Sequence, residues 1–216
     1  MTAQRATLPE AIAGPGIIAI CRRLRPEDLD PLIAAMLDGG IRAVEVTLDG
    51  AGALDAIRRA ATGAEERGLL LGAGTVLDVE AARAAVEAGA RFLVMPHAGI
   101  GVVEWAVDSG VPVLPGAMTP TEVLGCWRAG ATAVKVFPAS VVGTSFLREM
   151  GGPLRDIALV PTGGVRIDDV GPFIAAGAAA VGLGGGLIGD GTPDGVRERA
   201  ASAVTAVTDA RRTMGG

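Results

Sequence analysis

Several residue types that often mark function are scarce or missing from this sequence of 216 residues. It has no tyrosine, one histidine and two cysteines. Cys21 and Cys126 do not form a metal-ligand spacing, and nothing around them suggests a disulfide scaffold, so we expect neither a metal site nor a secreted protein. The segment Met1–Gly14 has no apolar run typical of a signal peptide, and nowhere do about 18 uninterrupted apolar residues predict a transmembrane helix. We therefore expect a cytoplasmic protein that does not bind a membrane.

Clusters of positive charge are also absent. The formal net charge is −5, and the basic residues are not grouped into a block that would attract nucleic acid or an anionic membrane. Half of the residues are hydrophobic, and the 33 glycines are spread along the chain, which argues against disorder. The length suits one domain, residues 1–216.

Short apolar segments alternate with longer amphipathic ones along the chain. The short segments are typical of buried strands, and the longer ones place apolar residues three and four positions apart, as on one face of a helix. The predicted strands are Ile17–Cys21, Ala43–Leu48, Leu69–Gly72, Phe92–Met95, Val111–Leu114, Ala133–Phe137, Ala158–Pro161 and Ala179–Leu183. The predicted helices are Glu27–Leu37, Val79–Ala88, Val102–Val107, Thr121–Trp127, Asp168–Ala176 and Val196–Ala210.

This alternation indicates the α/β class. Eight nearly continuous apolar strands with crossover helices predict a (β/α)8 TIM barrel, with an extra N-terminal segment or helix before the first strand. The alternative is an open, doubly wound sheet. The strand count favours the barrel, and no dinucleotide-binding glycine motif follows the first strand.

Lysine is used only once. Of the 19 lysine and arginine residues, 18 are arginine and one is Lys135, which lies in the apolar strand Ala133–Phe137. A buried amine can lose its proton near neutral pH and attack a carbonyl carbon to form an imine, whereas a guanidinium cannot. The alternative is a structural lysine that extends to solvent or pairs with a core carboxylate. Because arginine serves every other such position, the single lysine favours imine chemistry.

An imine-forming enzyme also needs a group that transfers protons. In the strand Ala43–Leu48, alternation places Glu45 and Thr47 on one face and the larger apolar residues on the other. If the apolar face packs against helices, Glu45 points into the barrel, where a carboxylate is costly unless it is paired or protonated. Glu45 is therefore the candidate acid/base, and a structural ion pair with Lys135 is the alternative.

Glycine-rich turns follow the last two predicted strands. Gly163 and Gly164 follow the seventh strand, and Gly184, Gly185 and Gly186 follow the eighth. Loops at these positions form the common phosphate site of barrels, because glycine lets backbone N–H groups approach phosphate oxygens closely. The two turns together predict a phosphate-binding region.

Two further polar residues follow predicted strands. Thr75, in the loop Gly72–Val76, offers a hydroxyl to a substrate carboxylate or carbonyl. His97 follows the fourth strand, where it is either a substrate contact or an exposed residue. With one histidine and no cysteine cluster, we expect no metal at this end of the barrel.

Several short motifs occur in a fixed order between about Gly16 and Gly189, and together they are highly specific. They are Gly16–Ile20, Val44–Leu48, Gly72–Val76, Pro115–Gly116, Val134–Ala139 and Pro161–Val165. In these motifs the chain resembles the family of 2-keto-3-deoxy-6-phosphogluconate (KDPG) and 4-hydroxy-2-oxoglutarate (KHG) aldolases, which are class I, or Schiff-base, aldolases.

The resemblance implies reversible cleavage of a 2-keto-3-deoxy-(6-phospho) sugar acid, or of 4-hydroxy-2-oxoglutarate, to pyruvate and an aldehyde such as glyoxylate. It implies Lys135 as the imine-forming residue and Glu45 as the general acid/base. It further implies no metal or other cofactor, 2-oxo acids and aldehydes as the small-molecule partners, and a homotrimer. The implied substrate-binding residues are Arg22, Thr47, Thr75, Pro96 and Phe137, and the implied phosphate-binding residues are Gly163, Gly164, Gly184, Gly185 and Gly186.

Two positions depart from the family pattern. An arginine that binds the substrate carboxylate often follows the Val44–Leu48 motif, where this chain has Asp49. Arg22, at the end of the first strand, is the candidate to replace it. The phosphate turn often holds a serine where this chain has Gly186. These departures concern the aldehyde partner and the phosphate more than the imine chemistry.

Two other functions fit the same residues. A phosphosugar isomerase or synthase on the same barrel would use Glu45 as a base and Lys135 only as a charge. A non-catalytic protein that binds phosphorylated metabolites would show binding without turnover. Replacing Lys135 by arginine separates imine chemistry, which should be lost, from an electrostatic role, which should leave activity.

Overall fold

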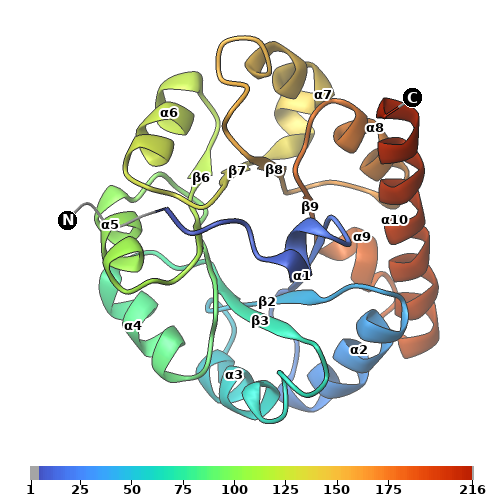
Figure 1. The fold of residues 1–216 in the computed structure, drawn as a ribbon. Helices are drawn as coiled ribbons and strands as arrows, with labels where there is room; N and C mark the ends of the chain where they lie inside the picture. The colour runs from blue at the N-terminus through green and yellow to red at the C-terminus, as the bar shows by residue number, and fades with distance from the viewer. Residues whose placement is uncertain (1–4, 216) are drawn as a thin grey trace.

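The computed structural model describes residues 5–215, an α/β structure in which all strand pairings are parallel and helices surround the curled sheets (Figure 1). The strands are β1 (Ile17–Cys21), β2 (Ala43–Thr47), β3 (Leu70–Gly74), β4 (Leu93–Val94), β5 (Val113–Leu114), β6 (Gly116–Ala117), β7 (Val134–Val136), β8 (Leu159–Pro161) and β9 (Val181–Leu183). The helices are α1 (Glu10–Ala13), α2 (Pro26–Asp38), α3 (Ala53–Ala61), α4 (Val79–Glu87), α5 (Ile100–Asp108), α6 (Pro120–Arg128), α7 (Ala139–Met150), α8 (Val170–Ala175), α9 (Gly185–Ile188) and α10 (Pro193–Met214), with a 3-10 turn η1 (Ile167–Asp169) before α8.

Strand pairing divides into two sheets. Six strands pair in the order β5-β4-β3-β2-β1-β9, and three pair in the order β6-β7-β8. Pro115 separates β5 from β6, and one isolated bridge between Thr162 and Gly182 connects the end of β8 to β9. The sheets are therefore parallel and curled, but the strand pairing is not continuous around a closed ring.

The eight predicted strands are all present, with ends that shift by two residues at most. The strand predicted to end at Leu114 is followed by a second short segment, β6, directly after Pro115. The break falls at Pro115 because a proline has no amide hydrogen to donate to a neighbouring strand. The six predicted helices are also present, and the last one extends to Met214. The sequence pattern did not predict α3, which follows the left-handed Gly52, or α7, which is broken at Gly143 with a φ of 64°.

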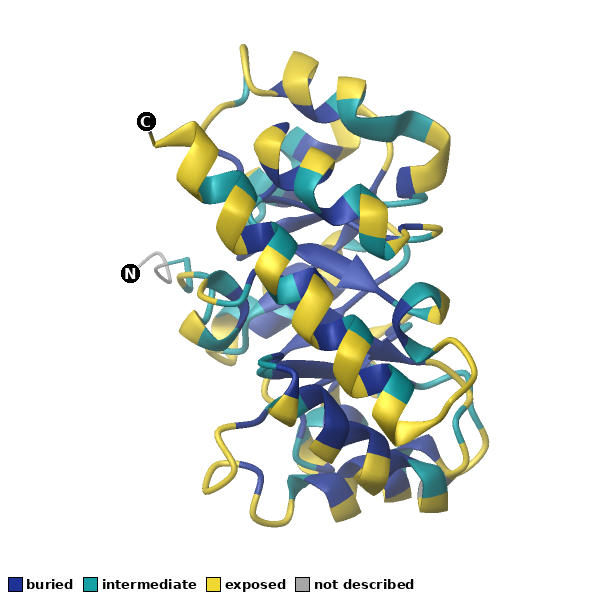
Figure 2. Cartoon of the chain, turned by 90° about the vertical axis from the view of Figure 1, so that its right-hand side faces the viewer, coloured by how far each residue is buried: buried dark blue, intermediate teal, exposed yellow. Residues whose placement is uncertain are grey.

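Strand residues alternate between an inner and an outer apolar cluster. In β2, Ala43 belongs to the inner cluster, whereas Val44 and Val46 pack in the outer one against the helices, as predicted. Figure 2 shows the buried strands between helices whose outer faces are exposed. Burial of each large apolar side chain is worth about 1.5–3 kcal/mol. A slip of one residue would exchange the two faces of β2, so burial fixes its register and keeps Glu45 inside.

The predicted N-terminal helix is the short α1, which lies across one end of the sheets (Figure 1). Its Ile12 is fully buried within the inner cluster, and Leu8 packs against that cluster. The inner cluster consists of Ile12, Ile18, Ala43, Phe92, Val94, Leu114, Ala133, Val160 and Ala180. Apolar side chains thus fill the end of the sheets at which the strands begin.

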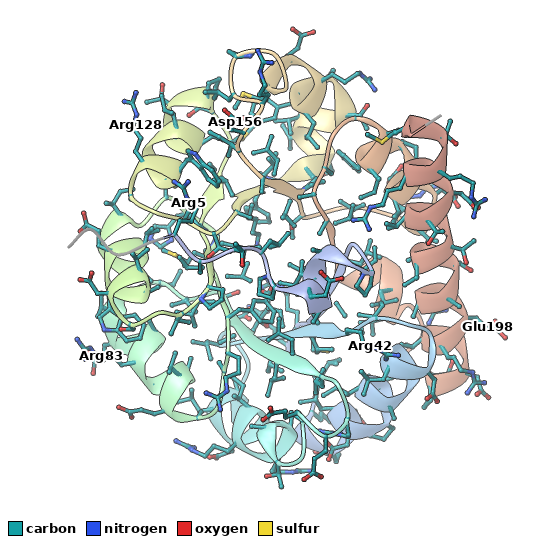
Figure 3. All side chains as sticks on the ribbon, viewed as in Figure 1. Arg5, Arg42, Arg83, Arg128, Asp156 and Glu198 are labelled. Carbon is teal, nitrogen blue, oxygen red and sulfur yellow. The ribbon has the colours of Figure 1, made fainter. Side chains whose placement is uncertain are left out.

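The outer faces of the helices carry charged side chains. Arg83 on α4, Arg128 on α6 and Glu198 on α10 are exposed and lie on the outside of the ring of helices (Figure 3). Within residues 5–215, none of the helices combines the length and the apolar character that crossing a bilayer requires.

Arg211 on α10 connects the C-terminal helix to the N-terminal segment. Its guanidinium donates hydrogen bonds to the carbonyl oxygens of Ala13 at 2.8 Å, Gly14 at 2.7 Å and Ala179 at 3.2 Å. The neighbouring Arg212 is exposed and pairs only with Asp209 one turn earlier, at 3.1 Å. Two adjacent arginines on one helix therefore have very different structural roles.

We predict that Arg211→Ala lowers the free energy of unfolding by about 1–3 kcal/mol, because the carbonyl groups of Ala13 and Ala179 lose part-buried hydrogen bonds and that of Gly14 loses an exposed one. Arg212→Ala is the matched control and should change it by less than about 0.5 kcal/mol, as expected for an exposed pair. Urea unfolding followed by circular dichroism measures both. Equal effects of the two substitutions would contradict the assigned role of Arg211.

Candidate active site

A cavity of about 570 Å³ opens at the carboxyl ends of the strands, the end at which parallel barrels collect side chains from several strands. A second hollow, of about 480 Å³ between α3 and α4, contains none of the predicted site residues. The residues that line the larger cavity are Ile20, Arg22, Thr75, Pro96, Lys135, Phe137, Thr162, Gly163, Gly164, Val165, Arg166, Gly184, Gly185 and Gly186.

Lys135 lies in β7, paired with Gly116 of β6 on one side and Val160 of β8 on the other. Its side chain is only 3% exposed, and its Nζ lies 4.8 Å from the centre of the Phe137 ring. Burial lowers the pKa of the Lys135 amine below its usual value, and it outweighs the opposing attraction of Glu45. The amine is therefore easier to deprotonate than an exposed lysine.

Glu45 lies in β2 and is 1% exposed. Burial raises the pKa of its carboxyl above the usual value, against the lowering effect of Lys135 and Arg22. Its Oε1 is buried without a hydrogen-bond partner. Gly74 makes room for this group, since a Cβ at that position would lie 1.6 Å from Oε1.

The two buried groups influence each other without direct pairing. No ion pair or hydrogen bond joins Glu45 to Lys135 among the interactions found within residues 5–215. Burial moves their pKa values in opposite directions, and both shifts favour a neutral amine beside a protonated carboxyl. This state supplies a nucleophile and a proton donor together, which a structural ion pair would not.

Asp49, the first departure from the family pattern, is held by two arginines. Its Oδ2 accepts hydrogen bonds from Arg22 at 2.9 Å and Arg23 at 3.0 Å. Burial alone would raise the pKa of Asp49, but the neighbouring Thr47 side chain and the two guanidinium groups lower it below the usual value. The cluster carries a net positive charge, so Asp49 does not leave this side of the cavity negative.

Thr75 connects this cluster to the cavity. Arg22 donates to the Thr75 hydroxyl at 3.4 Å, and both residues line the cavity. Thr75 has a φ of 57°, a left-handed conformation that is unusual for a β-branched residue and is often found at functional sites. Arg22 and Thr75 thus present polar groups to the same cavity as Lys135.

The two glycine-rich turns pack against each other, as their places after β8 and β9 predict. A Cβ at Gly186 would lie 2.8 Å from the carbonyl oxygen of Val165, whereas nothing lies within 4 Å of a Cβ built at Gly185. Gly186 is therefore required for this contact, and a serine hydroxyl fits at position 185 instead. Both turns face the cavity with little side-chain bulk.

Most of the predicted site residues meet at this cavity, with three exceptions. Glu45 is buried beneath the wall, and Thr47 is buried where it donates to the carbonyl oxygen of Cys21 at 3.4 Å. His97 is exposed and does not line the cavity, which favours the second of its two interpretations. No group of three His, Cys, Asp or Glu side chains in the described part of the chain is arranged to hold a metal ion.

Four lining residues were not among the predicted site residues: Ile20, Thr162, Val165 and Arg166. Ile20 lies two positions before Arg22 on the inward face of β1, and Thr162 directly follows β8, so strand alternation would have identified both. Arg166 gave no such signal, because it follows a glycine-rich turn whose path the sequence does not define. It is the second guanidinium group at the cavity, after that of Arg22.

Comparisons with known proteins agree with this arrangement. A solved structure described as native KDPGal superposes with a TM-score of 0.86 at 33% identity, covering 91% of this chain and 96% of that one. A cube-shaped protein cage designed by fusing symmetric oligomeric domains superposes with a TM-score of 0.87 at 32% identity, covering 93% of this chain and 74% of that one.

Sequence comparison identifies the family. A protein of Pseudomonas aeruginosa described as 2-dehydro-3-deoxy-phosphogluconate aldolase is 41% identical over 153 residues, which are 70% of this chain and 68% of that protein. The family model described as KDPG and KHG aldolase matches residues 10–200. This chain therefore belongs to the KDPG and KHG aldolase family.

Proposed function

We propose that this protein is a class I aldolase that reversibly cleaves a 2-keto-3-deoxy sugar acid to pyruvate and an aldehyde through an imine on Lys135. The observation that carries the proposal is the burial of the only lysine at the wall of a cavity, within electrostatic reach of a buried carboxyl group. Membership of the aldolase family supports the same reaction.

The proposed reaction begins with Lys135 as a neutral amine, which attacks the keto carbon to form a carbinolamine. Glu45, as a protonated acid, donates its proton to the departing hydroxyl, so that water leaves and an iminium forms. The resulting Glu45 carboxylate accepts the proton of the C4 hydroxyl. The C3–C4 bond then breaks, its electron pair forms an enamine with the iminium, and the aldehyde departs. Glu45 returns the proton to C3, and hydrolysis of the imine releases pyruvate and the free amine.

Arg22 is the proposed partner of the 2-oxo acid carboxylate, in place of the arginine that the family often has at position 49. It lines the same cavity as Lys135, and Asp49 and Thr75 hold its guanidinium. Pro96 and Phe137 complete the apolar wall of the pyruvyl site in this proposal. Thr47 is buried and does not line the cavity. A role for Thr47 in the site is supported only by its lowering of the pKa of Asp49.

The distal end of the substrate is proposed to lie at the two glycine-rich turns. Gly163, Gly164 and the turn from Gly184 to Gly186 line the cavity. Their backbone N–H groups are the kind of donors that phosphate oxygens accept from. A 6-phosphorylated sugar acid fits this arrangement, and 4-hydroxy-2-oxoglutarate would place its second carboxylate there.

We also propose the closed (β/α)8 barrel, with residues 1–216 as one domain. The proposal treats β5 and β6, separated only by Pro115, as two halves of one strand, which reduces nine strand segments to eight. The bridge between Thr162 and Gly182 would then be the closing contact of the barrel.

The homotrimer that the family resemblance implies is likewise a proposal. Four apolar side chains are exposed in segments that follow β3, β4, β6 and β7, at the carboxyl ends of strands: Leu77, Ile100, Met118 and Val141. Apolar side chains gathered at one end of a molecule favour burial against another copy. The likeness to a cage built from symmetric oligomeric domains supports such an assembly.

Pyruvate and borohydride together should add the mass of a reduced pyruvyl group to the peptide that contains Lys135, detected by mass spectrometry. Lys135→Arg should lose the adduct and lower kcat for cleavage by at least about a thousandfold, because a guanidinium does not form the imine. An unlabelled Lys135 in active protein would refute the imine. Substantial activity in Lys135→Arg would instead support the isomerase or synthase alternative.

Glu45→Gln should shift the pH dependence of this trapping to lower pH. When Glu45 is ionised, its carboxylate raises the pKa of Lys135, so removing that charge lets burial lower the pKa further and leaves more neutral amine at a given pH. Cleavage should also slow by about 10²–10⁴-fold when the proton donor is lost. Glu104→Gln, an exposed change of the same charge, is the control. A shift to higher pH would contradict the assigned coupling.

Arg22→Ala and Arg23→Ala form a matched pair, since both remove one hydrogen bond to the same Asp49 oxygen. Only Arg22 lines the active-site cavity. We expect Arg22→Ala to raise the pyruvate concentration for half-maximal trapping by about tenfold or more, the value of a charge-assisted hydrogen bond. Arg23→Ala should change it by less than about twofold. If Arg22→Ala and Arg23→Ala changed this concentration equally, the effect would come from loss of an ion pair to Asp49 and not from loss of a group that binds the substrate carboxylate.

A further inference from the structure

The wall of the active-site cavity has an unbalanced charge. Its lining residues include two guanidinium groups, those of Arg22 and Arg166, together with the amine of Lys135, and no carboxylate. Arg22 lies beside Thr75 at the ends of β1 and β3, whereas Arg166 follows the glycine-rich turn after β8. A ligand that fills the cavity therefore meets one guanidinium at the end of β1 and another beyond the end of β8, with the amine of Lys135 also on the wall.

The backbone of Arg166 is fixed on two sides. Its N–H donates to the Asp169 carboxylate at 2.9 Å. The turn after β9 packs directly against it, because a Cβ at Gly186 would lie 3.4 Å from the Cα of Arg166 and closer still to the carbonyl oxygen of Val165. The backbone of Arg166 thus lies where the two glycine-rich turns are in contact, although its side chain is 74% exposed.

The only acidic partner found for the Arg166 guanidinium in the described structure is Asp168. The two groups are 3.3 Å apart, and the Asp168 side chain is 83% exposed. Exposed ion pairs of this kind contribute little stability, so the guanidinium can exchange this partner for another anion at small cost. A phosphate dianion offers more charge and more acceptor oxygens than one carboxylate.

We propose that Arg166 is a specificity-determining residue that binds the terminal anionic group of the substrate and selects a phosphate monoester over a carboxylate or a hydroxyl. Before substrate binds, Asp168 holds the guanidinium beside the cavity. In the occupied site, the phosphate replaces Asp168, while the glycine N–H groups contact its other oxygens. This inference rests on the proposed aldolase function and deepens it by assigning to Arg166 the choice between phosphorylated and unphosphorylated substrates.

The test compares three cleavage substrates: a 6-phosphorylated 2-keto-3-deoxy sugar acid, its unphosphorylated counterpart, and 4-hydroxy-2-oxoglutarate. Arg166→Ala should raise KM for the phosphorylated substrate by about tenfold, and change KM for the unphosphorylated one by less than about twofold. The effect on 4-hydroxy-2-oxoglutarate should lie between these two. Arg166→Lys, a point charge without the planar fork, should recover part of the phosphate preference.

Asp168→Asn gives a prediction of opposite sign. It releases Arg166 from its competing partner, so KM for the phosphorylated substrate should fall. The expected change is only about twofold, because an exposed ion pair is weak. Arg148→Ala is the control for charge, since Arg148 is exposed on α7 and contacts Thr144 rather than the cavity. It should leave the KM of all three substrates unchanged.

Three results would overturn the proposal. They are an equal change in KM for phosphorylated and unphosphorylated substrates in Arg166→Ala, no change for either, or an effect of Arg148→Ala as large as that of Arg166→Ala. Borohydride trapping of pyruvate on Lys135 should remain intact in the Arg166 and Asp168 variants. Failure of trapping in the wild type would refute the aldolase function itself, so the two failures are distinguishable.

Discussion

The buried amine of Lys135 and the buried carboxyl of Glu45 impose the main constraint on this molecule. Both groups are removed from water, and no direct ion pair or hydrogen bond between them offsets the cost of this desolvation. Charged forms of both are disfavoured by burial, so the protein holds a site in which neutral forms and proton exchange are favoured. The fold has to supply the stability that this arrangement does not. It does so with an inner apolar cluster below the pair and an outer one between the strands and the helices.

Glycine on neighbouring strands provides the space for these groups. Gly74 in β3 lies against the Glu45 carboxyl, and Gly182 in β9 would place a Cβ 2.4 Å from the Thr162 hydroxyl. Gly116, paired with Lys135, packs its backbone against Pro96, where a Cβ would lie 2.5 Å from the carbonyl carbon. A side chain at any of these positions would have to displace a group of the site. The small residues of the strands are therefore part of the active-site geometry.

The sequence predicted the strands and the central pair because these depend on local properties. Apolar runs define the strands, a single lysine among arginines singled out Lys135, and alternation in β2 placed Glu45 opposite Val44 and Val46. The rest depends on contacts between distant segments. The sequence showed at position 49 an aspartate where the family often has an arginine, and only the structure places it against Arg22 and Arg23. The helix α3 was missed although its buried residues Ala53, Ala56, Ile57 and Ala60 have helical spacing, because three of the four are small alanines.

The apolar floor beneath Lys135 has a consequence for the sequence of events in the proposed reaction. Ile12 and the inner cluster fill the end of the sheets at which the strands begin, so the cavity opens toward the carboxyl ends. The pyruvyl fragment is bound covalently at the lysine, and the aldehyde lies between it and the opening. The aldehyde must diffuse away before water can arrive by the same route to free pyruvate. A closed floor thus dictates the order in which the two products depart.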